Sequence, residues 1–420
     1  MQLDRPDAPA HDGPGPLLRG YPRFRSQLVG YLVSMLGDQV GWIALVWLVL
    51  RLTGSASAVG VVTLVYIAPQ AFSGPFAGAL LDRFGRARVM ALANAGVAAL
   101  LAGVAVVAST VGAHGLWAVY LMVGSAGALV AFNTAGRIAL IAELVPPSLR
   151  ARANFLSQSG GQVAWLLGPA IGGAGVALVG SVPLLAADGA TYVILALVLA
   201  GIAAEPRPSA AASHMLADVW AGLRYLMGRR ELIALALLTV LFNFLYGPFE
   251  VLLPALAHAT LGGAWALGLL WSAFGVGSLG TTAVLTAWRG RLKPSRAFGA
   301  IIVGWALVAL AMTRVASEPE AVAVMLAGGV IYSPWSGLYA TVVQGMVPQT
   351  LRGRVAGAQS SLTVLGMPLG AFLTGLVLGH LESRTLFALS GGLTLAIGVV
   401  ALASPLLRRL DSASQAFGEA

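Results

Sequence analysis

Twelve long apolar segments follow one another along this 420-residue chain. A helix that crosses a bilayer needs about 20 mostly apolar residues, and each segment is long enough. The bilayer interior offers backbone groups no water, and the segments lack the short alternating pattern of barrel strands, so they are predicted to be helices. They lie near 27–50, 57–81, 89–110, 115–137, 154–178, 183–203, 232–257, 262–288, 297–316, 321–345, 355–379 and 385–406. The sequence therefore predicts an all-α integral membrane protein.

The composition excludes several other classes of protein. Hydrophobic residues make up 58% of the chain and charged residues 10%, against about 45–50% and 25% in soluble domains. The chain contains no Cys, which excludes disulfides, thiolate zinc sites and cysteine nucleophiles. The formal charge of +9 does not indicate a nucleic-acid partner, because the cations lie between the apolar segments, where membrane topology places them.

The distribution of the cations predicts the orientation in the membrane. If the N-terminus is cytoplasmic, 21 of the 25 Lys and Arg residues fall in cytoplasmic segments, whereas Arg51, Arg314 and Arg384 fall on the other side. Cytoplasmic loops carry an excess of Lys and Arg. We therefore expect a multi-pass protein of the cell (cytoplasmic) membrane with both termini in the cytoplasm.

An internal repeat divides the chain into two halves. Residues 145–152, Val-Pro-Pro-Ser-Leu-Arg-Ala-Arg, recur 202 residues later as Val-Pro-Gln-Thr-Leu-Arg-Gly-Arg. Each copy lies between the fourth and fifth segments of its half, which predicts two parallel six-helix bundles. The predicted organisation is a disordered cytoplasmic tail (1–22), an N-terminal bundle (23–203), a cytoplasmic linker with an amphipathic helix (204–231), a C-terminal bundle (232–407) and a second cytoplasmic tail (408–420).

The loop after the second segment carries a recognisable motif. It reads Gly78-x-x-x-Asp82-Arg83-x-Gly85-Arg86, and at this position it resembles the signature loop of the major facilitator superfamily. The run from Asn133 through Arg137 to Pro146 resembles the branch of that superfamily that contains macrolide-efflux and enterobactin-exporter proteins. The likeness covers residues 26 to about 406 and implies the major facilitator fold, with about twelve helices in two pseudo-symmetric six-helix bundles.

The resemblance also implies roles for particular residues. The signature residues, with Arg137, are implied to form a cytoplasmic gate or conformational lock; they are Gly78, Asp82, Arg83, Gly85 and Arg86. The segment Gly168-Pro169-Ala170-Ile171-Gly172-Gly173 resembles the end of an exporter motif, although Ala164 stands where that motif has a glycine. Small residues permit close helix approach and proline kinks a helix, so Gly168, Pro169, Gly172, Gly173 and Pro368 are predicted to be packing residues.

Three acidic residues lie within predicted membrane segments. Asp38 is near the middle of the first, where an ionised carboxylate costs about 2.5 kcal/mol or more. Burial disfavours the charged form of a carboxyl group, so we predict that Asp38 exchanges a proton during transport; the alternative is a structural partner for another polar helix. Glu250 is a second candidate for proton coupling, or a gate residue nearer the outer end. Asp188 is interpreted as structural.

Polar and aromatic residues at helical spacing predict a central chamber. The candidates for its wall are Trp42, Tyr66, Gln70, Asn133, Gln162, Trp165, Asn243, Tyr246, Trp335 and Tyr339. Each has a plain alternative, since polar residues bond between helices and aromatic residues fill packing. Together they suit small amphipathic or aromatic organic molecules.

The leading hypothesis is therefore a secondary exporter that exchanges small organic molecules, of drug or siderophore type, for protons by alternating access. Uptake or facilitated diffusion, and a membrane sensor that transports nothing, remain alternatives. The metalloprotease, hydrolase and P-loop motifs are absent from the sequence, so we expect no enzyme and no cofactor beyond the proton gradient. The expected partners are the substrate and the lipid bilayer, with a monomer as the functional unit.

Overall fold

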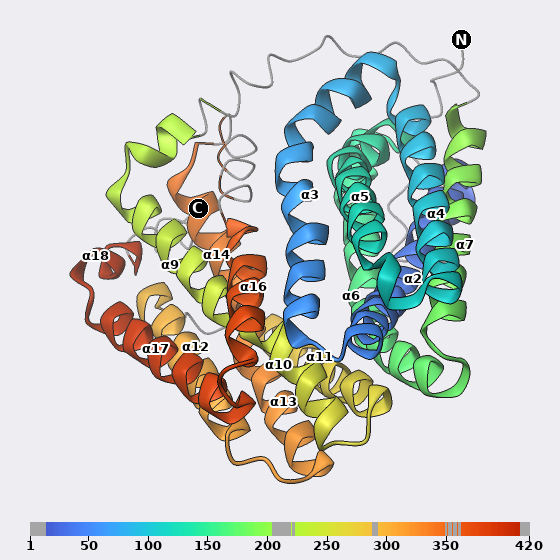
Figure 1. The fold of residues 1–420 in the computed structure, drawn as a ribbon. Helices are drawn as coiled ribbons and strands as arrows, with labels where there is room; N and C mark the ends of the chain where they lie inside the picture. Colours follow the sequence, from blue (N-terminus) through green and yellow to red (C-terminus); the bar gives the residue numbers. More distant parts are fainter. Residues whose placement is uncertain are drawn as a thin grey trace.

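The computed structural model describes residues 14–203, 220, 223–287, 293–348, 351, 355, 359 and 363–411. The chain over these residues folds into helices that lie in two groups (Figure 1). The helices are α1 (Pro14–Gly20), α2 (Pro22–Thr53), α3 (Ala56–Phe84), α4 (Arg86–Thr110), α5 (Leu116–Leu144), α6 (Arg150–Val179), α7 (Ser181–Ala203), α9 (Arg230–Tyr246), α10 (Pro248–Ala259), α11 (Ala264–Ala287), α12 (Pro294–Met312), α13 (Glu318–Tyr332), α14 (Pro334–Met346), α16 (Gly366–Leu378), α17 (Ser383–Ala403) and α18 (Pro405–Arg408).

The predicted membrane helices are confirmed within the described residues. Eleven helical stretches are long and apolar enough to cross a membrane, and the shorter apolar helix α16 lies within the predicted eleventh span. Two spans are not the single uninterrupted helices that the sequence suggested. The seventh is divided into α9 and α10 before Pro248, and the tenth into α13 and α14 before Pro334. Proline has no backbone N–H to continue the helical bonding, so a helix can begin at these residues.

The N-terminal tail differs from its prediction as a disordered segment. Residues 14–20 form the helix α1, so the interpretation of 1–22 as disordered is wrong for this stretch. Leu17 is only 2% exposed and belongs to a core cluster with Phe24 and Leu144. Burial of this leucine against two membrane helices stabilises the short helix. Residues 1–13 lie outside the described part of the chain.

Most of the predicted linker, 204–231, also lies outside the described residues. Leu226 is buried and Trp220 is exposed, and the Tyr225 hydroxyl donates a hydrogen bond of 2.9 Å to the carbonyl of Met346 in α14. The end of the linker is therefore attached to the second half. Beyond α18, Asp411 accepts hydrogen bonds from the backbone and hydroxyl of Ser295, and the rest of the predicted tail, 412–420, is not described.

The turns that connect α2 to α3 and α3 to α4 depend on glycine. Gly54 follows α2 with φ 61°, and Gly85 separates α3 from α4 with φ 89°. Residues with side chains rarely adopt such positive φ values. Gly85 belongs to the signature loop. Its positive φ allows the chain to reverse direction between α3 and α4.

Helix packing repeats between the two halves. In the first half α2 packs on α6, α3 on α5 and α4 on α7, and in the second half α9 packs on α16, α11 on α13 and α12 on α17. In each half, the first span packs on the fifth, the second on the fourth and the third on the sixth. Figure 1 shows α2 to α7 gathered in one bundle and α9 to α17 in the other. The predicted architecture of two related six-helix bundles is confirmed.

The two bundles meet along two helix pairs that the repeat also relates, α6 with α11 and α3 with α16. A Cβ added to Gly268 of α11 would lie 2.5 Å from the carbonyl oxygen of Pro169 and 2.9 Å from the Cα of Gly173. On the other pair, the Ser57 hydroxyl donates to the carbonyl of Gly375. Backbones thus touch directly between the halves, toward the helix ends that border the turn between α2 and α3.

We expect Gly268→Ala to destabilise the junction between the halves by about 1–3 kcal/mol, because the added methyl group overpacks a backbone contact. Gly201→Ala is the matched control, since nothing lies within 4 Å of a Cβ at that position, and its stability should stay unchanged or rise slightly with helix propensity. Apparent Tm at a fixed scan rate in detergent measures the difference. Equal Tm values for both variants would contradict close backbone contact at Gly268.

Candidate functional site

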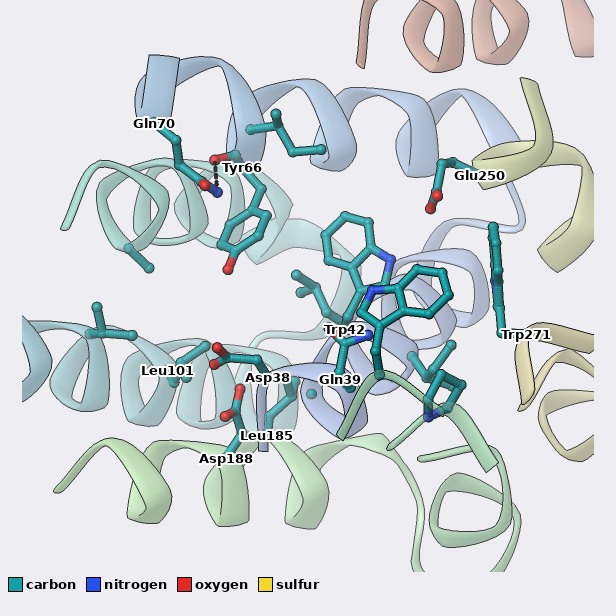
Figure 2. Close-up of a pocket in the computed structure, with 18 of the residues that line it drawn as sticks. Asp38, Gln39, Trp42, Tyr66, Gln70, Leu101, Leu185, Asp188, Glu250 and Trp271 are labelled. Carbon is teal, nitrogen blue, oxygen red and sulfur yellow. Dashed lines mark hydrogen bonds between the residues drawn. The ribbon is translucent and has the colours of Figure 1, made fainter. Parts of the chain in front are cut away.

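A cavity of about 460 Å³ lies between the two bundles. Helices α2 to α7 of the first half build one wall, and the second half closes the cavity with residues of α9, α10, α11, α13 and α16. Figure 2 shows side chains from the two halves turned toward the same space. The lining combines carboxyl, amide and aromatic groups, and no Lys, Arg or His is among the described residues that line it.

Two of the carboxyl groups stand side by side on the first wall. Asp38 of α2 and Asp188 of α7 are neighbours in Figure 2 and interact electrostatically. Tyr192 interacts with Asp38. The Thr191 hydroxyl donates at 2.7 Å to the backbone carbonyl of Asp188 and lies 3.4 Å from a carboxyl oxygen of the same residue. Neither carboxyl forms an ion pair with the described Lys and Arg residues, so the described residues place hydroxyl groups and no cation beside this pair.

The third carboxyl group belongs to the other half. Glu250 lies in the first turn of α10, is 8% exposed and interacts with the Trp42 side chain. Trp42 is on α2, so this contact joins the first span of one half to the first span of the other. Within the described residues, no three potential metal-ligating side chains gather in one place.

Aromatic rings form much of the remaining wall. Trp42 and Tyr66 lie with their ring centroids 5.4 Å apart, and Trp165 meets Trp271 edge to face at 6.3 Å. The second pair joins α6 to α11 across the junction of the bundles. Such rings offer flat apolar surfaces for an organic molecule, and each indole adds one N–H donor.

Half of the predicted wall residues line this cavity. They are Trp42, Tyr66, Gln70, Trp165 and Tyr246. Gln70 also donates to the Tyr66 carbonyl at 3.2 Å, which Figure 2 draws as a dashed line.

The other half of the predicted set has contacts elsewhere. Asn133 forms a reciprocal amide pair with Asn94 at 2.8 and 3.0 Å, and Asn243 donates to the Thr363 carbonyl. Trp335 is buried against Phe242, with ring centroids 4.6 Å apart. Gln162 is exposed and Tyr339 half-buried, and neither lines the cavity. For Asn133, Asn243 and Trp335 these contacts are of the kind that the packing alternative describes.

The lining residues that sequence reasoning did not assign to the cavity include Asp188, Tyr192 and Trp271. Asp188 was interpreted as structural because it lies toward one end of its span. A signal for it was present in Gly37-x-x-x-Gly41, which brackets Asp38, since small residues one turn apart mark a face where another helix approaches closely. Tyr192 follows from the same contact, one turn along α7.

The predicted lock residues lie at one end of the first bundle. Arg86 forms ion pairs with Asp82, at 2.8 Å, and with Glu143. It thereby connects α3, α4 and α5. The Arg83 guanidinium lies 5.2 Å from the centre of the Phe84 ring, while Gly78 lies within α3. Arg137 donates to the Ser157 hydroxyl at 3.0 Å and stands 4.9 Å over the Tyr31 ring, so it links α5 to α6 and α2.

The predicted packing residues all lie at close helix contacts. Gly168 faces Gln39 and Gly172 faces Val40 and Ile43, which brings α6 against α2. Gly173, one residue further, faces α11 instead. Pro169 is inside α6 and Pro368 is buried at the start of α16.

Comparisons with known proteins agree with this geometry. A sequence profile described as Major Facilitator Superfamily matches residues 28–371. The multidrug efflux pump Tap of Mycobacterium tuberculosis is 30% identical over 404 residues, which cover 93% of this chain and 95% of that protein. Macrolide efflux protein A of Streptococcus pyogenes is 24% identical over 402 residues, covering 93% and 97%.

Solved structures share the fold. The crystal structure of the nucleoside transporter NupG matches with a TM-score of 0.68 and 14% identity, over 91% of this chain and 98% of that one. The peptide transporter POT in complex with sulfate matches with a TM-score of 0.71 and 11% identity, over 91% and 95%. At these identities the likeness shows the arrangement of helices.

We expect Trp42→Phe to destabilise the protein by about 1–3 kcal/mol, because it keeps a ring beside Tyr66 but removes the indole N–H beside the buried Glu250. Adding Glu250→Gln to that variant should restore part of the loss, since an amide costs less to bury unpaired than a carboxyl group that can ionise. Trp165→Phe is the control, as it removes an indole from the same cavity without an acid partner. The pairing of the Trp42 indole with Glu250 is refuted if Glu250→Gln restores no stability in the Trp42→Phe background.

Proposed function

The chain belongs to the major facilitator superfamily, and we propose that it exports small amphipathic organic molecules in exchange for protons. It is a transporter of this family and not an enzyme. Its relatives are named as a multidrug efflux pump and a macrolide efflux protein, which supports export of compounds of the same broad kind. Siderophore-type molecules remain in the proposed class.

One observation supports this function above the others: the cavity between the bundles joins buried carboxyl groups to aromatic rings. Its volume of about 460 Å³ is within the range of about 300–1,000 Å³ common for sites that take drug-sized molecules. Trp42, Tyr66, Trp165 and Trp271 suit apolar or aromatic parts of a substrate. The lack of cations among the described lining residues disfavours phosphorylated or strongly anionic substrates.

The proposed orientation gives the cavity a side. With both termini in the cytoplasm of the cell membrane, the contacts of α6 with α11 and of α3 with α16 close the outer side of the molecule. Substrate would then enter from the cytoplasm, and rocking of the bundles would break these contacts to release it outside. The proposal takes one chain as the functional unit, because the cavity is formed within it.

The proposed coupling residues are Asp38 and Glu250, on opposite walls of the cavity. An ionised carboxylate is costly in such a place, so each tends to hold a proton when the cavity is dry and to release it when water or a cationic group approaches. The proton gradient is then the energy source, and no cofactor is needed. Arg86, bound to Asp82 and Glu143, is the proposed centre of the cytoplasmic lock, with Arg137 holding the neighbouring helices.

Everted membrane vesicles test the function directly. With the interior made acidic, we expect vesicles containing the wild-type protein to accumulate erythromycin and ethidium, because export turns inward when the membrane is everted. Asp38→Asn cannot exchange a proton and should abolish accumulation driven by the pH gradient. Radiolabelled erythromycin and ethidium fluorescence measure the two fluxes.

Glu382→Gln is the control for this experiment, because Glu382 is an exposed acid before α17 and far from the cavity lining. Its accumulation should equal that of the wild type. Asp38→Asn vesicles that accumulate both probes normally would refute coupling through Asp38. Accumulation by wild-type protein in right-side-out vesicles, and not in everted ones, would establish uptake instead of export.

A further inference from the structure

Asp188 was expected to be structural, yet it lies on the cavity wall beside Asp38. Its side chain is 6% exposed and reaches from α7 across to α2. Figure 2 shows its carboxyl group next to that of Asp38, at the edge of the space that Trp42 and Tyr66 border. A buried acid in this place either belongs to the transport machinery or is a costly accident of packing.

The shape of α2 indicates that this contact is built in. A Cβ added to Gly37 would lie 2.8 Å from one carboxyl oxygen of Asp188, and a Cβ added to Gly41 would collide with the other. Two glycines one turn apart thus form a notch that the Asp188 carboxyl and the Thr191 side chain of α7 fill. Asp38 follows Gly37 in the chain, so the notch brings the two acids together. Any larger residue at either glycine would push Asp188 away.

The groups around the pair leave its charge uncompensated. Tyr31 and Asp38 come from α2, Tyr66 from α3, Tyr192 from α7 and Glu250 from α10, while α4 contributes the apolar Val97 and Leu101. The Arg137 guanidinium lies over the Tyr31 ring and donates to the Ser157 hydroxyl. It forms no ion pair with either acid. Among the described residues the pair therefore has hydroxyl neighbours and no cation.

Two adjacent carboxyl groups of this kind act as a unit. Like charges side by side in a place of low polarity cannot both be ionised without a large cost, and one proton held between them removes the conflict. The protons of such a pair belong to both residues and not to either alone. A shared proton also explains how the buried Asp188 can stay beside the half-buried Asp38 without a counter-ion.

We propose that Asp188 is a second coupling residue, which holds one proton jointly with Asp38 in the glycine notch and releases it with Asp38 as a single unit. This rests on the proposed function, since it assigns a partner to the residue through which protons are exchanged. It changes the role of the first bundle, because the proton site then spans α2 and α7 and is sensitive to their separation.

Infrared difference spectra between acid and alkaline pH test the pair without any substrate. The purified protein in lipid should show a C=O band of a protonated carboxyl group that disappears on titration. We expect Asp188→Asn and Asp38→Asn each to abolish or shift that same band, and the double variant to differ little from either single one, because coupled residues are not additive. Gly41→Ala, which displaces Asp188 without removing a carboxyl group, should alter the band as well, whereas Gly201→Ala should not.

The outcomes are separable. If each single variant removes its own part of the signal and the two parts sum to the loss in the double variant, the acids are independent and the proposal is wrong. A band that survives Asp188→Asn unchanged also refutes it, while coupling through Asp38 alone still stands. Because the spectra need no substrate, wild-type vesicles that fail to move erythromycin or ethidium would overturn the proposed function and leave the shared proton to be judged on its own.

Discussion

The lipid bilayer requires every spanning segment to satisfy its own backbone, so this fold depends on how closely complete helices can approach one another. Glycine sets that distance at each decisive contact. Gly173 and Gly268 let α6 and α11 touch between the bundles, and Gly168 and Gly172 seat α6 on α2. Helix α6 therefore packs on α2 of its own bundle through Gly168 and Gly172, and on α11 of the other bundle through Gly173. The cavity is the space that remains between surfaces fixed by these contacts.

The polar chemistry is distributed unequally over that space. The first bundle supplies the paired acids Asp38 and Asp188, whereas the second contributes Glu250 and a dense group of aromatic rings, in which Tyr246 and Trp305 stack with centroids 5.0 Å apart. The inequality extends to the loops. Arg86 is paired with Asp82 and Glu143 in the first half, but the corresponding loop of the second half, around Lys293, has no acidic residue in its sequence. The duplicated fold thus carries two specialised halves.

The sequence predicted the architecture better than the cavity. Hydropathy and charge located the spans because solvation by lipid acts on each segment independently of its neighbours, and the repeat at residues 145–152 revealed the two halves. The wall of a cavity depends on how each helix is rotated, which spacing alone leaves open. Asn133 and Trp165 looked equally suitable, yet Asn133 faces Asn94 within its bundle and Trp165 faces the other bundle. Likewise α1 was predicted to be disordered. Its buried residue Leu17 alone cannot form the periodic apolar pattern from which a helix is predicted.

The contact between Trp42 and Glu250 joins the polar groups of the two bundles. Trp42 is one helical turn from Asp38 on α2, so this contact lies close to the acid pair. Any movement of α2 that widens the glycine notch also moves Trp42 relative to α10. If protons are exchanged at Asp38 and Asp188 as proposed, a single movement of α2 would change both the acid pair and the contact between the bundles. Under that proposal, α2 needs no separate relay to link the protonation of the cavity to the separation of the two bundles.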